Sequence, residues 1–277
     1  MDTAAEVAEF LRDAAGRLRA PDLEWNGPLR VGIDLGTATI VIAVVDSAGR
    51  PVYLDFRREA AVRDGVVVDF HAAAAATAAL KESAEAALGV CLPDAAAAYP
   101  PGVPEADARA CRFVLERAGF NCVALVDEVT AAAALLRIQN GAIADVGGGS
   151  TGVGVYRDGE LVELGDLPGG GHHLNLILAG AKKISVEEAE RLKREDRSID
   201  PLPVLRSGIE RIAHNIGRLM PTRPAGPVHL VGGALMVPGA GAVIAGYLGH
   251  EITEYPQALL ITPFGIAMSA DGLSHPL

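Results

Sequence analysis

The strongest constraint on the fold of this chain is a strand–turn–strand pattern that occurs twice. The first copy, residues 31–39 (VGIDLGTAT), leads into an apolar run that reaches Val45. The second copy, residues 142–151 (AIADVGGGST), is followed by another strand-like run. In each copy an aspartate ends the first apolar run, and a glycine follows it two positions later, which predicts a tight turn between two strands.

The residues that follow each aspartate are small, so several backbone N–H groups remain accessible. A turn of this kind binds anions, because its donors point at a phosphate and no large side chain blocks the approach. Both copies then reach a further turn and a third strand-like run, which predicts two similar domains that grip a phosphate chain from both sides. The candidate phosphate-binding residues are Gly36, Thr37, Ala38, Thr39, Gly147, Gly148, Gly149, Ser150 and Thr151.

The two aspartates are candidate magnesium ligands. Mg²⁺ keeps most of its waters and needs few carboxylates, so Asp34 and Asp145 suit a hydrated ion that bridges two phosphates, and they could also orient a water molecule. A lone aspartate at a strand end is usually a turn residue, but the duplication favours the functional interpretation. The second turn is not a P-loop, because no lysine follows its glycines.

Composition limits the classes of partner. The formal charge of −11 opposes general binding to nucleic acid or to an anionic membrane, although a local basic patch for DNA is not excluded. We find no signal peptide and no apolar run of membrane-spanning length, so a cytoplasmic protein is expected. The three cysteines lack a C-x-x-C pairing, and reduced, buried thiols are expected.

Strands alternate with helices along the chain, which predicts an α/β fold. Residues 2–20 form an amphipathic helix that packs on the first domain or, less favoured, docks a partner. The β units cover residues 29–56 and 141–167. A strand at 228–231 breaks into Gly232-Gly233, and we expect a helix over residues 235–248.

Three further features have two interpretations each. Glu128, at the start of a helix, either complements the helix dipole or acts as a base or water-positioning group. The Gly232-Gly233 pair either forms an ordinary turn or lets a ligand lie against the backbone. Glu190 and Lys193 lie three apart on one helix, where a solvated ion pair is the default.

Five stretches resemble, in order, the motifs of the actin-like ATPase superfamily, which includes actin, the seventy-kilodalton heat-shock chaperones and sugar kinases. Residues 34–37 and 145–151 are similar to its two phosphate motifs, and residues 228–239 to its adenosine motif. Residues 128–133 (EVTAAA) and 263–268 (PFGIAM) are similar to its two connecting helices. The resemblance implies two ribonuclease-H-like domains around a cleft for ATP or ADP with Mg²⁺.

Within the superfamily the chain resembles the EutJ family of ethanolamine-utilization proteins, through its length, its leading helix and residues 63–70 and 182–193. The first of these stretches is also similar to the bacterial actin MreB. The resemblance implies an N-terminal helix (1–26), a domain I (27–141 plus 258–277) and a domain II (142–257). It implies catalytic roles for Asp34, Glu128 and Asp145. By position it implies nucleotide contacts at Gly170, Gly171, Glu190, Lys193, Gly232, Gly233 and Ala234.

The chain departs from the chaperone pattern in three ways. No peptide-binding domain is expected after the motifs, which argues against direct client folding by that route. The lysine that assists hydrolysis has no clear counterpart and Val129 replaces the usual proline, so slow or absent hydrolysis is expected. Arg57, Arg58 and Lys81 are only nearby basic residues.

The leading hypothesis is therefore a chaperone-like protein of ethanolamine utilization that closes on Mg-ATP, hydrolyses it slowly and controls a protein client, with a bacterial microcompartment as one location for that client. The alternatives are a nucleotide-gated scaffold or regulator that assembles with itself or acts on protein or DNA, and, ranked last, a small-molecule kinase.

Overall fold

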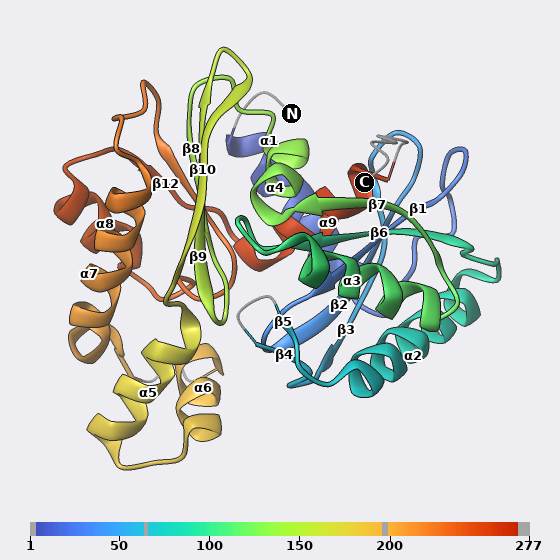
Figure 1. The fold of residues 1–277 in the computed structure, drawn as a ribbon, viewed down its shortest axis with the longest axis horizontal. Helices are drawn as coiled ribbons and strands as arrows, with labels where there is room; N and C mark the ends of the chain where they lie inside the picture. Colours follow the sequence, from blue (N-terminus) through green and yellow to red (C-terminus); the bar gives the residue numbers. More distant parts are fainter. Residues whose placement is uncertain (1–3, 64–65, 196–198, 271–277) are drawn as a thin grey trace. The chain divides into compact units, whose positions relative to one another are not determined.

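The structure is a computed structural model that describes residues 4–63, 66–195 and 199–270 (Figure 1). The chain divides into two compact units, residues 1–137 with 259–277 and residues 138–258. The predicted α/β class is confirmed, because each unit has a mixed five-stranded sheet within the described residues. Parts of the expected leading helix, of stretch 63–70 and of domain I fall on residues 1–3, 64–65 and 271–277, which lie outside the described residues.

The sheet of unit 1 has the strand order β3-β2-β1-β6-β7. Its strands β1 to β3 form an antiparallel meander, and β6 and β7 add to β1 in parallel. A short hairpin, β4 (Val62–Arg63) and β5 (Val66–Val67), follows the meander. The strands of the main sheet are β1 (Arg30–Leu35), β2 (Thr39–Val45), β3 (Pro51–Arg58), β6 (Asp94–Tyr99) and β7 (Asn121–Asp127).

Helices α2 (Phe70–Leu88) and α3 (Glu105–Arg117) pack against the unit 1 sheet and share a core with it. Asp69 caps α2 by accepting a hydrogen bond from the Ala72 amide, 2.9 Å. Gly89 ends the same helix in the left-handed conformation, φ 71°, as its position in the sequence predicts.

The leading helix, α1 (Ala4–Gly16), ends at Gly16 rather than at the predicted residue 20, because the segment after it pairs with β3. It buries Val7, Leu11 and Ala14 within unit 1. Its Phe10 ring makes an edge-to-face contact with Phe264, with the ring centroids 5.5 Å apart. The apolar face of α1 is thus used in packing, which agrees with the favoured of the two interpretations.

The crossing of α4 (Glu128–Leu136) and α9 (Ile261–Met268) is the tightest helix contact in unit 1. A Cβ at Gly265 would lie 1.9 Å from the Ala131 carbonyl oxygen. On β1, a Cβ at Gly32 would lie 2.4 Å from the Ala267 amide nitrogen. Glycine at these two positions lets α9 lie directly on backbone from both α4 and the sheet.

Unit 2 repeats the design with the strand order β10-β9-β8-β11-β12. Its strands β8 to β10 are again an antiparallel meander, and β11 and β12 are parallel to β8. The strands are β8 (Gly141–Val146), β9 (Ser150–Arg157), β10 (Glu160–Pro168), β11 (Val228–Val231) and β12 (Ile252–Thr253). The helices are α5 (Gly171–Lys182), α6 (Val186–Glu195), α7 (Leu202–Leu219) and α8 (Ala240–Leu248), and a short 3₁₀ turn, η1 (Ala258–Leu260), precedes α9.

One predicted helix limit in unit 2 is wrong. Helix α8 begins at Ala240 rather than at Leu235, because Pro238 and Gly239 precede it and Gly239 has φ 84°, outside the helical region. Helix α5 continues past Gly180 to Lys182, since a single glycine weakens a helix without ending it. In the described part of the chain, no helix is both long and apolar enough to cross a membrane.

Candidate functional site

The two aspartate turns have the same register. In unit 1, Leu35 pairs with Ile40 and Asp34 with Val41, so residues 36–39 form the turn. In unit 2, Val146 pairs with Thr151 and Asp145 with Gly152, so residues 147–150 form a turn of equal length. The duplication read from the sequence is therefore present in the hairpin geometry of each unit.

Both turns carry amide groups that make no backbone hydrogen bond within the described chain. None of the backbone hydrogen bonds among the described residues engages the N–H of Gly36, Thr37 or Ala38, nor that of Gly148 or Gly149. The Gly147 amide is the exception, because it donates to Ser150 O, 3.1 Å, and closes its own turn. Unused donors at a turn of small residues are what an anion-binding turn requires.

Asp145 and Gly232 are in close contact in unit 2. Asp145 is only 6% exposed. Gly232 has φ 84°, and a Cβ there would lie 2.5 Å from Asp145 Oδ1 and 2.4 Å from Val146 O. The Ala234 amide donates to Val146 O, 3.1 Å. The Gly232-Gly233 turn is thus held against the aspartate turn, and only glycine fits the first position.

Helix α5 begins against the same turn. The Gly171 and His172 amides donate to Gly147 O, 2.9 Å, and Gly148 O, 2.8 Å. A Cβ at Gly170 would lie 2.4 Å from Gly147 O. The first amides of α5 therefore fix the shape of the turn, and the Gly171 amide is engaged by a carbonyl rather than open to a phosphate.

The Glu190–Lys193 pair of α6 lies beside this assembly and is not the solvated pair that its spacing suggests. Lys193 is 6% exposed and its Nζ lies 3.1 Å from Glu190 Oε2. The Asn175 side-chain amide also donates to Glu190. The Lys193 Nζ lies 3.5 Å from the point that a Cβ at Gly171 would occupy. Spacing on a helix could not reveal this burial, because it comes from α5 packing on α6.

Burial lowers the pKa of Lys193, although the neighbouring Glu190 carboxylate acts to raise it. For Glu190 burial alone would raise the pKa, but Lys193, with Asn175 and Arg194, lowers it. The two groups thus hold each other in the charged state next to the start of α5.

A cavity of about 230 Å³ adjoins the Gly232 turn and was not predicted from the sequence. Its walls come from residues 230–238, which continue β11, and from residues 254–258, which follow β12. Met236 and Gln257 are among the lining side chains. On β11, His229 stacks on Tyr255, whose hydroxyl lies 2.7 Å from His229 Nδ1. Burial lowers the pKa of His229 to about 4 and raises that of Tyr255 to about 12, so at neutral pH the ring is neutral and the hydroxyl keeps its proton.

In unit 1, Asp34 and Glu128 lie within electrostatic range of the same thiol. Burial raises the pKa of Cys111 on α3 to about 12, and the negative charges of Glu128 and, less, Asp34 add to that shift. Asp127 caps α4 by accepting from the Thr130 amide, 2.8 Å, and hydroxyl, 2.5 Å, which fixes Glu128 in the first turn of the helix. Of the three cysteines expected to be buried, only Cys111 is; Cys122 is half-buried and Cys91 is exposed.

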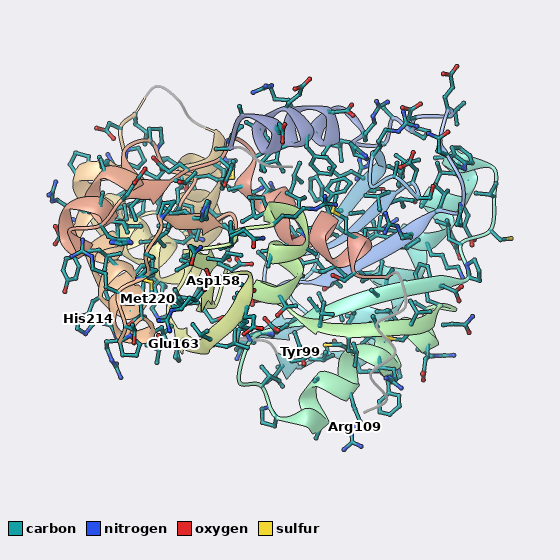
Figure 2. All side chains as sticks on the ribbon, turned by 90° about the horizontal axis from the view of Figure 1, so that it is seen from above. Tyr99, Arg109, Asp158, Glu163, His214 and Met220 are labelled. Carbon is teal, nitrogen blue, oxygen red and sulfur yellow. The ribbon has the colours of Figure 1, made fainter. Side chains whose placement is uncertain are left out.

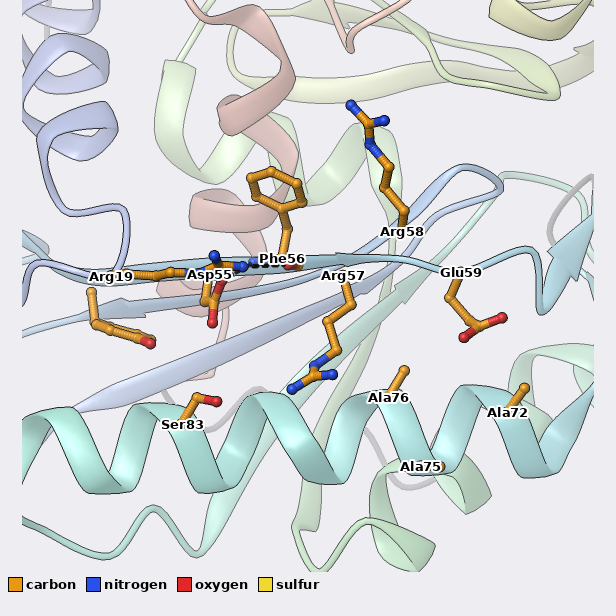
Figure 3. A pocket seen from close by; sticks show the side chains of 11 residues that line it. Arg19, Asp55, Phe56, Arg57, Arg58, Glu59, Ala72, Ala75, Ala76 and Ser83 are labelled. Carbon is orange, nitrogen blue, oxygen red and sulfur yellow. Dashed lines mark hydrogen bonds and ion pairs between the residues drawn. The ribbon is translucent and has the colours of Figure 1, made fainter. Parts of the chain in front are cut away.

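Of the basic residues of unit 1, Arg58 and Arg57 pair with Thr39 and Ile40 and so lie beside the first aspartate turn, whereas Lys81 lies on α2. Arg57 and Arg58, at the end of β3, point in opposite directions, and Arg57 faces a groove of about 1040 Å³ between β3 and α2 (Figure 3). Lys81 on α2 donates to Gly119 O and stands 4.6 Å from the centroid of the Phe120 ring. Lys81 is therefore committed to packing α2 against the end of α3.

The donor set of each unit fits a hydrated magnesium ion better than a metal held by protein alone. Among the described residues, no three His, Cys, Asp or Glu side chains are grouped as a metal centre. Asp145 stands at the start of a turn whose Gly148 and Gly149 amides make no backbone hydrogen bond, so a cation there would take its remaining ligands from water and from the phosphates that the turn binds. The residues present are compatible with that arrangement.

Comparisons with known proteins give the class. A profile of the family described as MreB/Mbl protein matches residues 56–183. The structure of MreB5 of Spiroplasma citri bound to ADP superposes with a TM-score of 0.70 at 18% identity, over 86% of this chain and 94% of that one; the AMPPNP-bound form gives the same score. The chain therefore has the actin-like ATPase fold.

Two nearer relatives give the family. The ethanolamine utilization protein EutJ of Salmonella typhimurium is 36% identical over 268 residues, 95% of each chain. The crystal structure of EutJ from Carboxydothermus hydrogenoformans has a TM-score of 0.90 at 38% identity, covering 96% of this chain and 98% of that one. The chain belongs to the EutJ family.

Proposed function

We propose that this protein is a nucleotide-dependent switch of ethanolamine utilization that binds Mg-ATP and Mg-ADP through its two aspartate turns. The observation that carries the proposal is the repeated turn of equal register, with Asp34 or Asp145 at its start and unused amides along it. The nucleotides in the MreB5 structures support it by analogy of fold. The place in ethanolamine breakdown comes from the relatives' name.

In this proposal the amides of both turns donate to the phosphate chain. Asp34 and Asp145 accept from the waters of the magnesium ion, which would supply charge neutralisation of the phosphates when bound. Gly170, Gly171, Gly232, Gly233 and Ala234 give the nucleotide a surface without side-chain obstruction, and Lys193 with Glu190 supports the nucleoside. Glu128 orients the water that attacks the terminal phosphate.

We propose slow turnover rather than fast. Arg57 faces a groove lined by β3 and α2, and Lys81 is engaged with Gly119 and Phe120. With these two cations directed to other parts of unit 1, less positive charge is available to stabilise the transition state beyond the metal and the amides. The same observation supports a second candidate, a nucleotide-gated scaffold or regulator that binds without appreciable hydrolysis.

The test of binding is isothermal titration calorimetry with ATP, ADP and GTP, each in Mg²⁺ and in EDTA. We expect magnesium-dependent binding of ATP and ADP, weakened about tenfold or more by Asp145→Asn. The matched control is Asp158→Asn, which changes a carboxylate in the β9–β10 turn of the same unit. Titrations without heat for any nucleotide, or equal binding by Asp145→Asn and the wild-type protein, would refute the proposal.

A phosphate-release assay then separates the two candidates. Release at a low steady rate that Glu128→Gln abolishes indicates the slow ATPase, whereas binding without release indicates the gated scaffold. Pull-downs from cell extract with ATP and with ADP would identify a protein client, and a client retained in only one nucleotide state supports the switch.

A further inference from the structure

The two units differ in whether other residues cover the edge strand that ends the duplicated meander. Strands β3 and β10 are the third strands of the duplicated meander, and each lies at an edge of its sheet. An edge strand presents unpaired N–H and C=O groups to any other extended chain, so proteins usually cover or blunt it. Comparing the two edges therefore shows where the chain leaves a strand open to a partner.

The β3 edge is covered. The segment after α1 pairs with it through three backbone hydrogen bonds, from Arg19 N to Leu54 O, Leu54 N to Arg17 O and Asp22 N to Val52 O, at 2.9–3.1 Å. Beyond Leu54, the Asp55 carboxylate accepts from the Phe56 amide, 2.8 Å, and from Arg19 Nε, 2.7 Å (Figure 3). The backbone of this edge is thus satisfied within unit 1.

The β10 edge is open. Within the described residues, β10 pairs with β9 on one side and takes part in no backbone hydrogen bond on the other. The side-chain amide of Asn215 on Pro168 O, 3.1 Å, lies at the very end of the strand. At nine residues β10 is the longest strand described in either sheet, and Leu161, Val162 and Leu164 on it are 37%, 43% and 43% exposed. A long edge strand with unpaired backbone groups is the geometry that accepts an added strand, although the register irregularity between Leu161 and Glu163 interrupts its first part.

The charge of β10 restricts what can pair with it. Its sequence, ELVELGDLP, has three carboxylates and no lysine or arginine. Glu163, labelled in Figure 2, has an Oε2 atom buried from solvent and without a hydrogen-bond partner among the described residues. A second copy of β10 would bring like charges together across the new pair, which is unfavourable. A strand with lysine or arginine would supply the missing donor and opposite charge.

We propose that β10 binds an extended, basic segment of another protein by strand addition, with alternate apolar side chains of that segment packing on Leu161, Val162 and Leu164. The apolar contacts lie at residues 161–164, at the end of β10 away from Ser150 and Thr151, and the proposal does not depend on nucleotide binding. Backbone hydrogen bonds supply the affinity, and the carboxylates select the basic partner over acidic strands.

The test uses a fluorescent nine-residue peptide of alternating lysine and valine and measures its anisotropy on titration with the full chain. We expect saturable binding that weakens in high salt, an affinity about tenfold lower for Glu163→Lys, and slower amide hydrogen exchange in residues 160–168 with the peptide bound. Glu9→Lys makes the same charge change on an exposed residue of α1 and should leave binding unchanged. Urea unfolding of both variants checks that they fold.

Any of four results would overturn the proposal. These are no binding at millimolar peptide, equal binding of a peptide in which glutamate replaces lysine, protection from exchange elsewhere than β10, and equal affinity of the Glu163→Lys variant and the wild-type protein. Light scattering that shows the chain pairing with itself through this edge, with loss of the dimer on Leu164→Lys, would also replace the basic partner with a second copy.

Discussion

At the scale of single residues, the ionisable groups of unit 2 are the most informative. Two of them have environments that sequence position did not reveal. Lys193 is buried against Glu190 and the start of α5, and His229 is a neutral, stacked ring on β11. Each residue leads to a separate prediction about stability, because burial makes the charged form less favourable in the folded chain than in the unfolded chain.

Lys193→Met is expected to lower the free energy of unfolding at pH 7 by about 1–3 kcal/mol, since it leaves the Glu190 carboxylate without its closest cation. Adding Glu190→Gln should recover part of that loss, so a double-mutant cycle in urea should give a coupling above about 1 kcal/mol. The control pair is Arg206 and Glu210 on α7, 3.0 Å apart and 63% and 40% exposed. Its coupling should stay below about 0.5 kcal/mol. Equal coupling for the two pairs would contradict the burial of Lys193.

His229 predicts a loss of stability in mild acid. The pKa of His229 is about 4 in the folded chain and about 6.5 in the unfolded chain. Below pH 6.5 this residue therefore binds a proton in the unfolded chain but not in the folded chain. The stabilisation that comes from keeping this ring neutral is complete above pH 6.5. It is lost as the pH falls towards 4, and about 2 kcal/mol of it is lost at pH 5.

The measurement for His229 is urea unfolding between pH 7.5 and pH 4.5 for the wild-type protein and His229→Gln. The wild-type curve should fall more steeply with acid than that of the variant, because glutamine does not titrate. His71→Gln replaces an exposed histidine and should keep the wild-type slope. Identical slopes for His229→Gln and the wild-type protein would show that the ring is not held neutral.

At the scale of elements, the crossing of α4 and α9 is the least tolerant contact. Gly265→Ala is expected to destabilise unit 1 by about 3 kcal/mol or more, because the new methyl group would lie 1.9 Å from Ala131 O and backbone must move. Gly246→Ala in α8 is the control. It meets nothing within 4 Å and should stabilise that helix by about 0.5–1 kcal/mol. Thermal unfolding of both variants gives the comparison, and a neutral Gly265→Ala would mean that the helices are not in contact as described.

The elements also show why some predictions from sequence succeeded and others failed. The strand–turn–strand repeat was predictable because alternating apolar runs, an aspartate and glycine are local signals. The start of α8 was predicted too early. Residues 235–237 are apolar enough to belong to a helix, but Pro238 and Gly239 prevent the helix from starting before Ala240. The burial of Lys193 and the Gly265 contact depend on which elements pack together, which no local pattern contains.

At the scale of the whole molecule, the family and the α/β fold with two duplicated sheets are established by the relatives, and the nucleotide is the part that is proposed. The residues predicted for unit 2 are assembled around one turn, and those of unit 1 lie at the ends of β1 and β7. The proposal requires both aspartate turns to contact one nucleotide, although they are far apart in the sequence and belong to different units.

The most direct measurement is amide hydrogen exchange of the full chain with and without Mg-ADP and Mg-ATP. The account predicts slower exchange at residues 36–39 and at residues 147–150 together, with the same dependence on nucleotide concentration and loss of both effects in EDTA. Protection of one turn alone, or no change in either turn at saturating nucleotide, would contradict it.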